Sequence, residues 1–369
     1  MTVTRKYLDY AQTAADILTE NWFGPDAPQR WVPADFWRTP NIMMALNGLM
    51  GLTGSNQYQQ TLDNGLKAYS GLGYPCAYYD DEAWWGAAFL RIYARTKDER
   101  YLSAAVGLFK DLSGGWDDHV GGGVWFKRYP KDYSDNDKNS VSTSLYFEIA
   151  GLLFGSPAKQ SHYLDAAKRA SVWMQRLIDG HALVWGNLRD DGRVEQSNPP
   201  RPYTQGTMLG ALTALYDATK DPSLLDWAIK IADVTLDSMI WPGGVLRDTY
   251  EVLGDQRPDL LDPILFKPIL ARYLGEFAVR LAAIPERKAA ATRYADFLRL
   301  NADAVWVNYP QHIFGMDWHL PQPNYKESGV LFYDGSLQSG ALDLFLAAAR
   351  VDFRFPSSTP TTSSPSTAD

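Results

Sequence analysis

Cysteine and histidine are scarce in this sequence, which holds 1 cysteine, Cys76, and 5 histidines among 369 residues. A single cysteine excludes an internal disulfide framework and any cysteine-ligated zinc or iron–sulfur cluster within one chain. The histidines form neither an HExxH motif nor a pair spaced four residues apart, so a histidine metal site has no local support. The sequence therefore predicts no metal site and no other cofactor.

Net positive charge and long apolar runs are also missing. Lys and Arg number 35 against 43 Asp and Glu, and the resulting net charge of −8 repels a phosphate backbone. No apolar run reaches the length of a membrane span, and the N-terminal residues lack the apolar core of a signal peptide. We expect no nucleic-acid partner and no membrane span. As written, the sequence predicts a cytoplasmic protein, or a secreted one if the native chain begins further upstream.

Aromatic residues are abundant, with 13 Trp and 21 Tyr. Both side chains combine a flat apolar face with a hydrogen-bonding edge, which suits a wet groove that stacks on rings. Aromatic residues that only fill a core would give the same composition, so both interpretations stay open.

Helical periodicity runs through most of the chain, whereas the alternation typical of sheets is nearly absent. Apolar residues recur at helical spacing in segments 4–22, 41–54, 57–71, 80–96, 98–113, 139–154, 159–179, 203–219, 222–240, 262–283, 286–304 and 335–350. The helix-start pattern KDERYLSAA at 97–105 returns as KQSHYLDAA at 159–167 and as DPSLLDWA at 221–228. Each repeat therefore corresponds to one pair of helices.

Six helix pairs can stack as an open solenoid or close into an (α/α)6 barrel. Irregular long connections after alternate helices favour closure, because a barrel elaborates the loops of one rim to build a site. The predicted fold class is all-α, an (α/α)6 barrel with short β-hairpins in rim loops at 121–128, 182–191 and 243–251. We expect one domain over residues 1–352, a disordered Pro/Ser/Thr-rich tail over 353–369, and a monomer.

Two adjacent carboxylates, Asp80 and Asp81, stand at the start of a predicted helix, with Tyr79 before them and Trp84 after them. Capping alone accounts for acidic residues at this place, since carboxylates compensate the helix dipole. Paired carboxylates beside aromatic rings are also what cleavage of a glycosidic bond needs. One acid protonates the leaving oxygen, and a carboxylate attacks or stabilises the oxocarbenium-like centre.

A second acidic pair strengthens that hypothesis. Asp117 and Asp118 follow Trp116 in a Gly-rich loop. Three further polar residues near predicted helix starts are candidates for the same rim, although each could simply cap its helix, namely Asn139, Gln205 and Lys267. We therefore predict that Tyr79, Trp84, Trp116, Asp117, Asp118, Asn139, Gln205 and Lys267 contact the substrate.

Together these motifs resemble glycoside hydrolase family 76, the α-1,6-mannanases and the related fungal cell-wall transglycosidases. The most specific matches are YYDDEAWW at 78–85 and GWDDHVGGGVWF at 115–126, and supporting matches are KNSVSTSLYFEIA, YTQGTMLGAL and FKPILARYL. The resemblance covers about residues 5–350. It implies an (α/α)6 barrel and retaining endo-hydrolysis of α-1,6-mannan or mannooligosaccharides, with Asp80 as nucleophile and Asp81 as general acid/base.

Other functions stay open at this point. A transglycosidase would use the same dyad, because hydrolysis and transfer share the glycosyl-enzyme intermediate. A non-catalytic mannan-binding barrel would keep the aromatic groove, and an epimerase or isomerase would need inward histidines, of which only His119 lies in a candidate loop.

Glu82 stands where the family usually has Asn, and Phe126 where a second Trp is usual. We expect Glu82 to lie beside the dyad, where it would raise the pKa of the acid or alter a sugar contact.

Overall fold

The computed structural model describes residues 5–23, 37–71, 76–128, 136–249, 251, 262–320 and 335–355. The α-helices in these ranges are α1 (Lys6–Leu18), α2 (Arg38–Thr53), α3 (Gln59–Gly71), α4 (Tyr79–Thr96), α5 (Glu99–Ser113), α6 (Ser140–Phe154), α7 (Ser161–Met174), α8 (Pro202–Thr219), α9 (Pro222–Ser238), α11 (Phe266–Ala282), α12 (Lys288–Asn308) and α13 (Gly335–Arg354). Every segment predicted from periodicity coincides with one of these helices.

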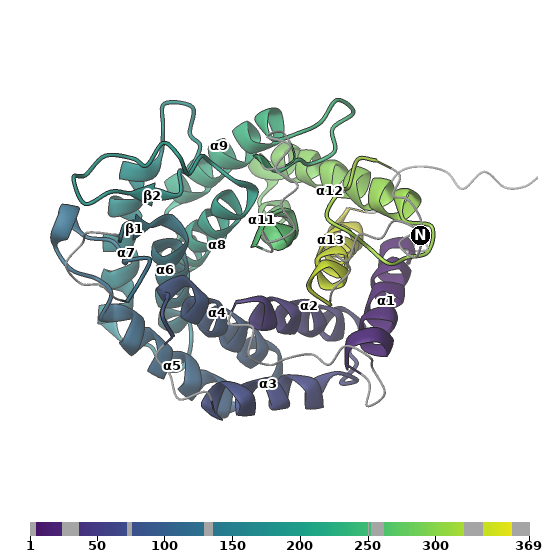
Figure 1. The fold of residues 1–369 in the computed structure, drawn as a ribbon, viewed down its shortest axis with the longest axis horizontal. Helices are drawn as coiled ribbons and strands as arrows, with labels where there is room; N and C mark the ends of the chain where they lie inside the picture. Colours follow the sequence, from purple (N-terminus) through teal and green to yellow (C-terminus); the bar gives the residue numbers. More distant parts are fainter. Residues whose placement is uncertain are drawn as a thin grey trace, which may run out of the picture.

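The helices form two concentric rings (Figure 1). Helices α2, α4, α6, α8, α11 and α13 make the inner ring, in which each contacts the next and α13 returns to α2. Helices α1, α3, α5, α7, α9 and α12 pack around them as the outer ring. Because the inner ring is closed, the predicted (α/α)6 barrel is confirmed and the open solenoid is excluded.

The two rings differ in sequence for a simple physical reason. Inner helices are covered on all sides, so α6 buries nearly every residue from Ser140 to Leu153 and uses small, apolar and hydroxyl side chains. An outer helix meets the core along one face only. In α5 the buried residues Tyr101, Leu102, Ala105, Leu108, Phe109 and Leu112 follow helical spacing.

Glycine allows two pairs of inner helices to approach backbone to backbone. A Cβ at Gly206 of α8 would lie 2.9 Å from the Cα of Leu270 in α11. A Cβ at Gly275 of α11 would lie 2.8 Å from the Cβ of Ala347 in α13. A methyl group fits at neither position, so these contacts fix the spacing between inner helices, which we call the staves of the barrel.

The two rims carry connections of different length. Lys97 and Asp98 alone join α4 to α5, and Lys220 and Asp221 alone join α8 to α9. In both turns the lysine adopts a left-handed conformation, and the aspartate accepts a hydrogen bond from a first-turn backbone N–H of the following helix. The sequence repeat therefore marks these tight turns of the barrel.

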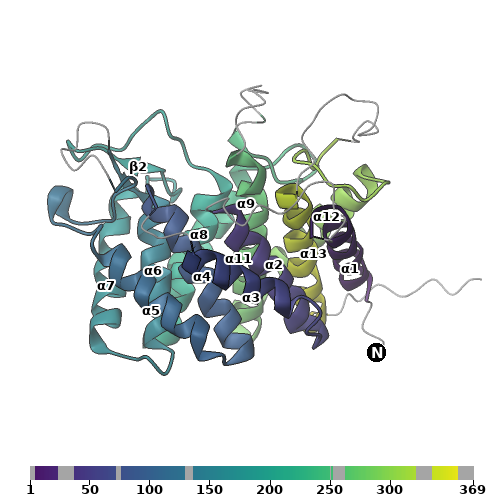
Figure 2. The ribbon, with the colours of Figure 1, turned by 60° about the horizontal axis from the view of Figure 1, so that its bottom comes forward.

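Most connections from an outer helix to the next inner helix are long, and the described residues between α5 and α6 and between α7 and α8 lie at the opposite rim (Figure 2). This loop-rich rim carries β1 (Lys138–Asn139) and β2 (Asn187–Leu188), which pair antiparallel with Lys138 opposite Leu188. Isolated bridges between Ile178 and Val184 and between Ile240 and Leu246 form further short hairpins. The predicted rim hairpins are therefore present as short strands and bridges.

Buried polar side chains at the fourth position of three inner helices anchor the loops that precede them. Thr143 of α6 accepts a hydrogen bond from Val124 N at 2.9 Å, Gln205 of α8 from Val184 N at 2.9 Å, and Gln338 of α13 from Phe314 N at 3.1 Å. The first turn of each of these inner helices thus fixes the loop that leads into that helix.

Helix α13 ends at Arg354, and residues 356–369, which make up most of the predicted tail, lie outside the described residues. Within the described ranges, no helix has both the length and the apolar composition needed to cross a membrane.

Candidate active site

The acidic pair lies in the first turn of α4, at the loop-rich rim. Tyr78 has an extended conformation and its side chain makes no capping hydrogen bond. Instead the backbone N–H of Asp81 donates to Asp80 Oδ1 at 3.0 Å. Both aspartates are half-buried. A carboxylate that accepts a first-turn N–H is stabilised in its ionised form by that bond and by the helix dipole.

Trp84, which is buried, is the helical neighbour of both carboxylates on α4. Trp84 follows Asp80 by four residues and Asp81 by three, which are the spacings of neighbours on a helix surface. Its ring lies 6.5 Å from that of Trp37, the residue before α2 on the neighbouring stave. Arg91, seven residues further along the same face, reaches Glu148 of α6 and Glu276 of α11. The dyad therefore lies at the mouth of the barrel.

Aromatic rings continue across this mouth from one stave to the next. Trp37 lies 6.4 Å from Phe266, the first residue of α11, and Phe266 stacks on Tyr203 of α8 at 3.8 Å and an angle of 4°. We call Trp84, Trp37, Phe266 and Tyr203 the rim aromatic row. Of these four, only Trp84 was among the predicted site residues. The sequence could have indicated Trp37, Phe266 and Tyr203 by their position at or beside the start of an inner helix.

Glu82 directly follows the dyad, but its side chain is buried and paired with an arginine of the loop after α5, a contact that the sequence did not indicate. Its buried carboxylate is 2.5 Å from Arg128 Nη2, and the same nitrogen is 2.5 Å from Asp111 of α5. Burial and the neighbouring carboxylate of Asp111 raise the pKa of Glu82 to about 8, and they outweigh the opposing effect of Arg128. Glu82 therefore links α4 to α5 instead of facing a sugar.

Arg128 also fixes the chain just before the dyad. Its Nε donates to Cys76 O at 3.0 Å, and its backbone N–H donates to Ala77 O at 2.8 Å. The backbone N–H of Tyr79 donates in turn to Phe126 O at 2.9 Å. The guanidinium lies 4.3 Å from the centre of the Tyr79 ring. Segment 126–128 thus sets where α4 begins.

Tyr79 is buried beneath this loop. A Cβ at Gly115 would lie 2.8 Å from Tyr79 Cζ, so only glycine fits above the ring. Trp116 turns away from the dyad as well, toward Tyr146 of α6 at 5.6 Å and Arg169 of α7 at 5.5 Å. Both residues therefore pack the 114–128 loop onto the barrel.

Asp117 forms an ion pair with the fully buried Lys138 at 2.7 Å and accepts a hydrogen bond from Trp125 Nε1 at 2.8 Å. Burial alone would raise the pKa of Asp117, but the bonds from Lys138 and Trp125 outweigh it and lower that pKa. Burial lowers the pKa of Lys138 to about 8, although Asp117 opposes the shift. Asp118 is exposed on the loop surface.

The remaining predicted residues hold the rim together. Asn139 caps α6 by accepting from Val141 N and Ser142 N at 2.8 Å, and its amide donates to Asn187 in β2. Gln205 is fully buried and binds both the N–H and the carbonyl of Val184. Lys267 forms a buried ion pair with Glu251. The capping alternative is thus what the contacts of Asn139 support, whereas Gln205 and Lys267 instead hold other segments of the rim.

The structure brings Asp80, Asp81 and Trp84 together at the mouth and puts the other predicted residues in the loops and helix starts around it. In the ranges that the structure describes, no group of three or more His, Cys, Asp or Glu side chains is arranged to hold a metal ion.

The chain matches known proteins in family and in fold. The sequence profile of glycosyl hydrolase family 76 matches residues 4–343. Mannan endo-1,6-alpha-mannosidase DFG5 of Candida albicans is 24% identical over 214 residues, which are 53% of this chain and 46% of that protein. The Saccharomyces cerevisiae protein of the same name is 23% identical over 324 residues, 79% of this chain and 65% of that protein. The chain thus spans about half to two thirds of these relatives.

Two solved structures share the fold. An inactive variant of the α-1,6-mannanase from Salegentibacter sp. HEL1_6, with two adjacent aspartates replaced and α-1,6-mannotetrose bound, superposes with a TM-score of 0.77 at 24% identity and covers 94% of this chain and 99% of that chain. Dfg5 from Chaetomium thermophilum, in complex with glucosamine, superposes with a TM-score of 0.75 at 15% identity and covers 95% and 92%.

Proposed function

The chain belongs to glycosyl hydrolase family 76, and from that premise we propose that it is a retaining endo-α-1,6-mannanase in which Asp80 is the nucleophile and Asp81 the general acid/base. The observation that carries the proposal is the placement of this adjacent pair in the first turn of α4, above Trp84 and at the mouth of the barrel. Retaining enzymes need two carboxyl groups about 5–5.5 Å apart, a separation that side chains of consecutive residues can reach.

The two aspartates have different tasks in this mechanism. Asp80 must be ionised to attack the anomeric carbon, and its hydrogen bond from Asp81 N favours the ionised form. Asp81 must hold a proton, and the adjacent negative charge of Asp80 raises its proton affinity. Asp80 attacks C1 while Asp81 gives its proton to the departing glycosidic oxygen. Asp81 then removes a proton from the water that attacks C1, which releases the sugar and regenerates Asp80.

The rim aromatic row supports an uncharged sugar chain as substrate. Trp37 and Tyr203 are half-buried, so part of each ring stays accessible, whereas Trp84 and Phe266 are buried. Accessible aromatic faces stack on the C–H surfaces of pyranose rings. The α-1,6-mannanase to which this chain is similar is inactive when two adjacent aspartates are replaced and holds α-1,6-mannotetrose. This agrees with α-1,6-linked mannan as the substrate class and with Asp80 and Asp81 as the reacting pair.

Product analysis tests the proposal. We would incubate the protein with linear α-1,6-mannan, and with β-1,4-mannan as the control polymer, and follow products by mass spectrometry. Early release of mixed short mannooligosaccharides from the α-1,6 polymer alone is expected for internal cleavage. Products longer than a defined mannohexaose substrate would indicate transglycosylation by the same dyad. Binding of α-1,6-mannan with no change in chain length would contradict both enzymatic functions.

A further inference from the structure

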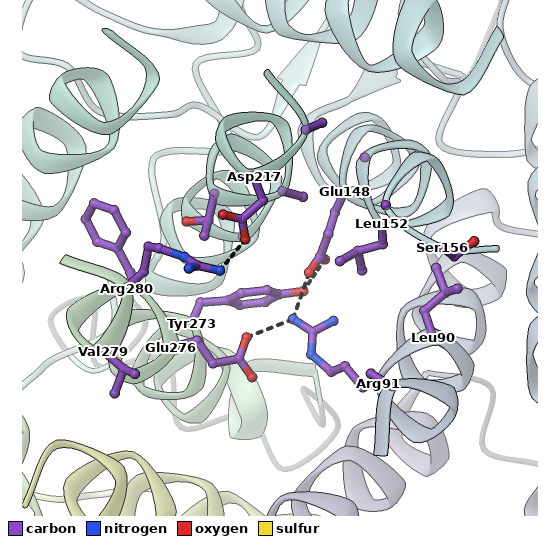
Figure 3. A pocket seen from close by; sticks show the side chains of 18 of the residues that line it. Leu90, Arg91, Glu148, Leu152, Ser156, Asp217, Tyr273, Glu276, Val279 and Arg280 are labelled. Carbon is purple, nitrogen blue, oxygen red and sulfur yellow. Dashed lines mark hydrogen bonds and ion pairs between the residues drawn. The ribbon is translucent and has the colours of Figure 1, made fainter. Parts of the chain in front are cut away.

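A cavity lies toward the rim opposite the dyad, and Figure 3 shows side chains that line it. Its volume is about 1040 Å³, and it is lined by the C-terminal halves of α4, α6, α8 and α11 together with Arg354 of α13. Arg91, in its wall, follows Asp80 by eleven residues, which is about 16 Å along the helix axis. This far-rim cavity is therefore distinct from the mouth that carries Asp80 and Asp81.

A buried polar network forms the inner end of the far-rim cavity. Arg91 donates to Glu148 at 2.7 Å and to Glu276 at 3.0 Å, and the hydroxyl of Tyr273 donates to Glu148 at 2.6 Å. Gly210 makes room for it, because a Cβ there would lie 2.2 Å from the Tyr273 ring. The network connects three staves and separates the cavity from the catalytic mouth.

A second ion pair lies nearer to the solvent. Arg280 in the last turn of α11 pairs with Asp217 of α8, and their side chains are 41% and 35% exposed. Part of each group therefore faces the cavity, with N–H donors on one and carboxylate acceptors on the other. The wall thus offers donors and acceptors side by side.

The charges of this cavity cancel locally. Arg91 pairs with Glu148 and Glu276, Glu276 also pairs with Arg350 at 3.5 Å, and Arg280 pairs with Asp217, so three arginines face three carboxylates. The C-terminal ends of the surrounding helices contribute partial negative charge, which Lys97 and Arg354 at the opening offset. An anion would meet the carboxylates and helix ends, and a cation would meet the arginines. Neither sign of charge is favoured.

We propose that the far-rim cavity is a binding site for an uncharged polyhydroxylated ligand, a mono- or disaccharide. Adjacent hydroxyl groups both donate and accept hydrogen bonds, as the Arg280–Asp217 pair and the exposed edges of the Arg91 network require. The volume matches the range of about 300–1,000 Å³ that is usual for small-molecule sites. The proposal does not depend on a catalytic role for Asp80 or Asp81.

Calorimetry with D-mannose and α-1,6-mannobiose tests this site. The parent protein would carry Asp81→Asn to prevent cleavage. Thr213→Trp, a substitution on the cavity wall in α8, fills the space. Val172→Trp places the same side chain at an exposed position of α7, where Val172 is 67% exposed, and is the matched control. We expect Thr213→Trp to remove one binding site, while Val172→Trp binds as the parent does.

A second variant keeps the test decisive if Thr213→Trp does not fold. Asp217→Asn combined with Arg280→Gln keeps a polar side chain at both positions, removes both charges and shortens the side chain at position 280, and we expect at least tenfold weaker binding at the same site. Equal binding by the parent and both variants would overturn the proposal. Tighter binding of mannose 6-phosphate than of mannose at this site would overturn the assignment to an uncharged ligand.

Discussion

Arg128 Nη2 lies 2.5 Å from the buried carboxyl group of Glu82, and this hydrogen bond joins the loop after α5 to the start of the helix that carries the acidic pair. Through the same side chain, Arg128 holds the carbonyl of Cys76 on the other side of the dyad. Asp80 and Asp81 are thus fixed between two segments that one guanidinium connects. A helix start positioned in this way needs no side-chain cap of its own, which leaves its carboxylates available for chemistry.

Glu82 should make stability depend on pH. Its pKa is about 8 in the folded protein against an ordinary value of 4.5, so the folded state holds this proton more tightly than the unfolded state. The free energy of unfolding should therefore fall as pH rises from about 4.5 to 8, by up to about 1.4 kcal/mol per pH unit for one proton. Glu82→Gln cannot titrate, so its urea-unfolding curves at pH 5, 6, 7 and 8 should lack this contribution.

The control for this experiment is Glu286→Gln, since Glu286 is exposed in the turn before α12. It should keep the slope of the parent protein. Parallel pH profiles for the parent and Glu82→Gln would mean that Glu82 is ionised across the whole range.

Asp117 and Lys138 should act mainly on stability. Asp117→Asn leaves the buried ammonium group without its charge partner, whereas Lys138→Met removes that charge. Because the Asp117 side chain is 39% exposed, we expect the first change to cost about 1–3 kcal/mol, less than for a wholly buried pair. In a double-mutant cycle followed by chemical denaturation, the double variant should be more stable than the sum of the single effects predicts. Strict additivity would show that the two groups do not interact.

The barrel itself could be predicted because its signals are local. Helical periodicity located the staves, and the repeated helix-start pattern marked where α5 and α9 begin, directly after the tight turns Lys97–Asp98 and Lys220–Asp221. The capping alternative for Asn139 also depended on neighbours only two and three residues away. Patterns of this range are visible in a sequence because the contacts that select them lie within one turn of a helix.

The surroundings of the dyad could not be predicted because their contacts are distant in sequence. Glu82 and Arg128 are 46 positions apart, and nothing near Glu82 indicates that its partner lies in the following loop. Gln205 binds Val184, 21 positions earlier, so its position at a helix start suggested a sugar contact instead of a loop anchor. The rim aromatic row is assembled from four staves and exists only after the ring closes.

Substitution of either dyad residue should remove activity without unfolding the protein. We expect Asp80→Asn and Asp81→Asn each to lower the rate on α-1,6-mannan by several orders of magnitude, since general acid/base catalysis alone contributes about 10²–10⁴-fold. Melting temperatures should stay within a few degrees of the parent. Asp98→Asn is the matched control, because Asp98 caps α5 at the opposite rim. A dyad variant that stays within tenfold of the parent would assign that aspartate a capping role.

The stereochemistry of the first product connects the geometry of the dyad to its mechanism. Asp80 and Asp81 are consecutive in the first turn of α4, so little room is left for a water molecule between their carboxylates. A covalent intermediate on Asp80 and water activated by Asp81 invert the anomeric carbon twice, and the α-anomer must be released first. Early-time proton NMR of the reducing end measures this directly. An initial β-anomer would require a base further from the nucleophile, and Asp117 and Asp118 of the 114–128 loop would then be the nearest candidates to substitute.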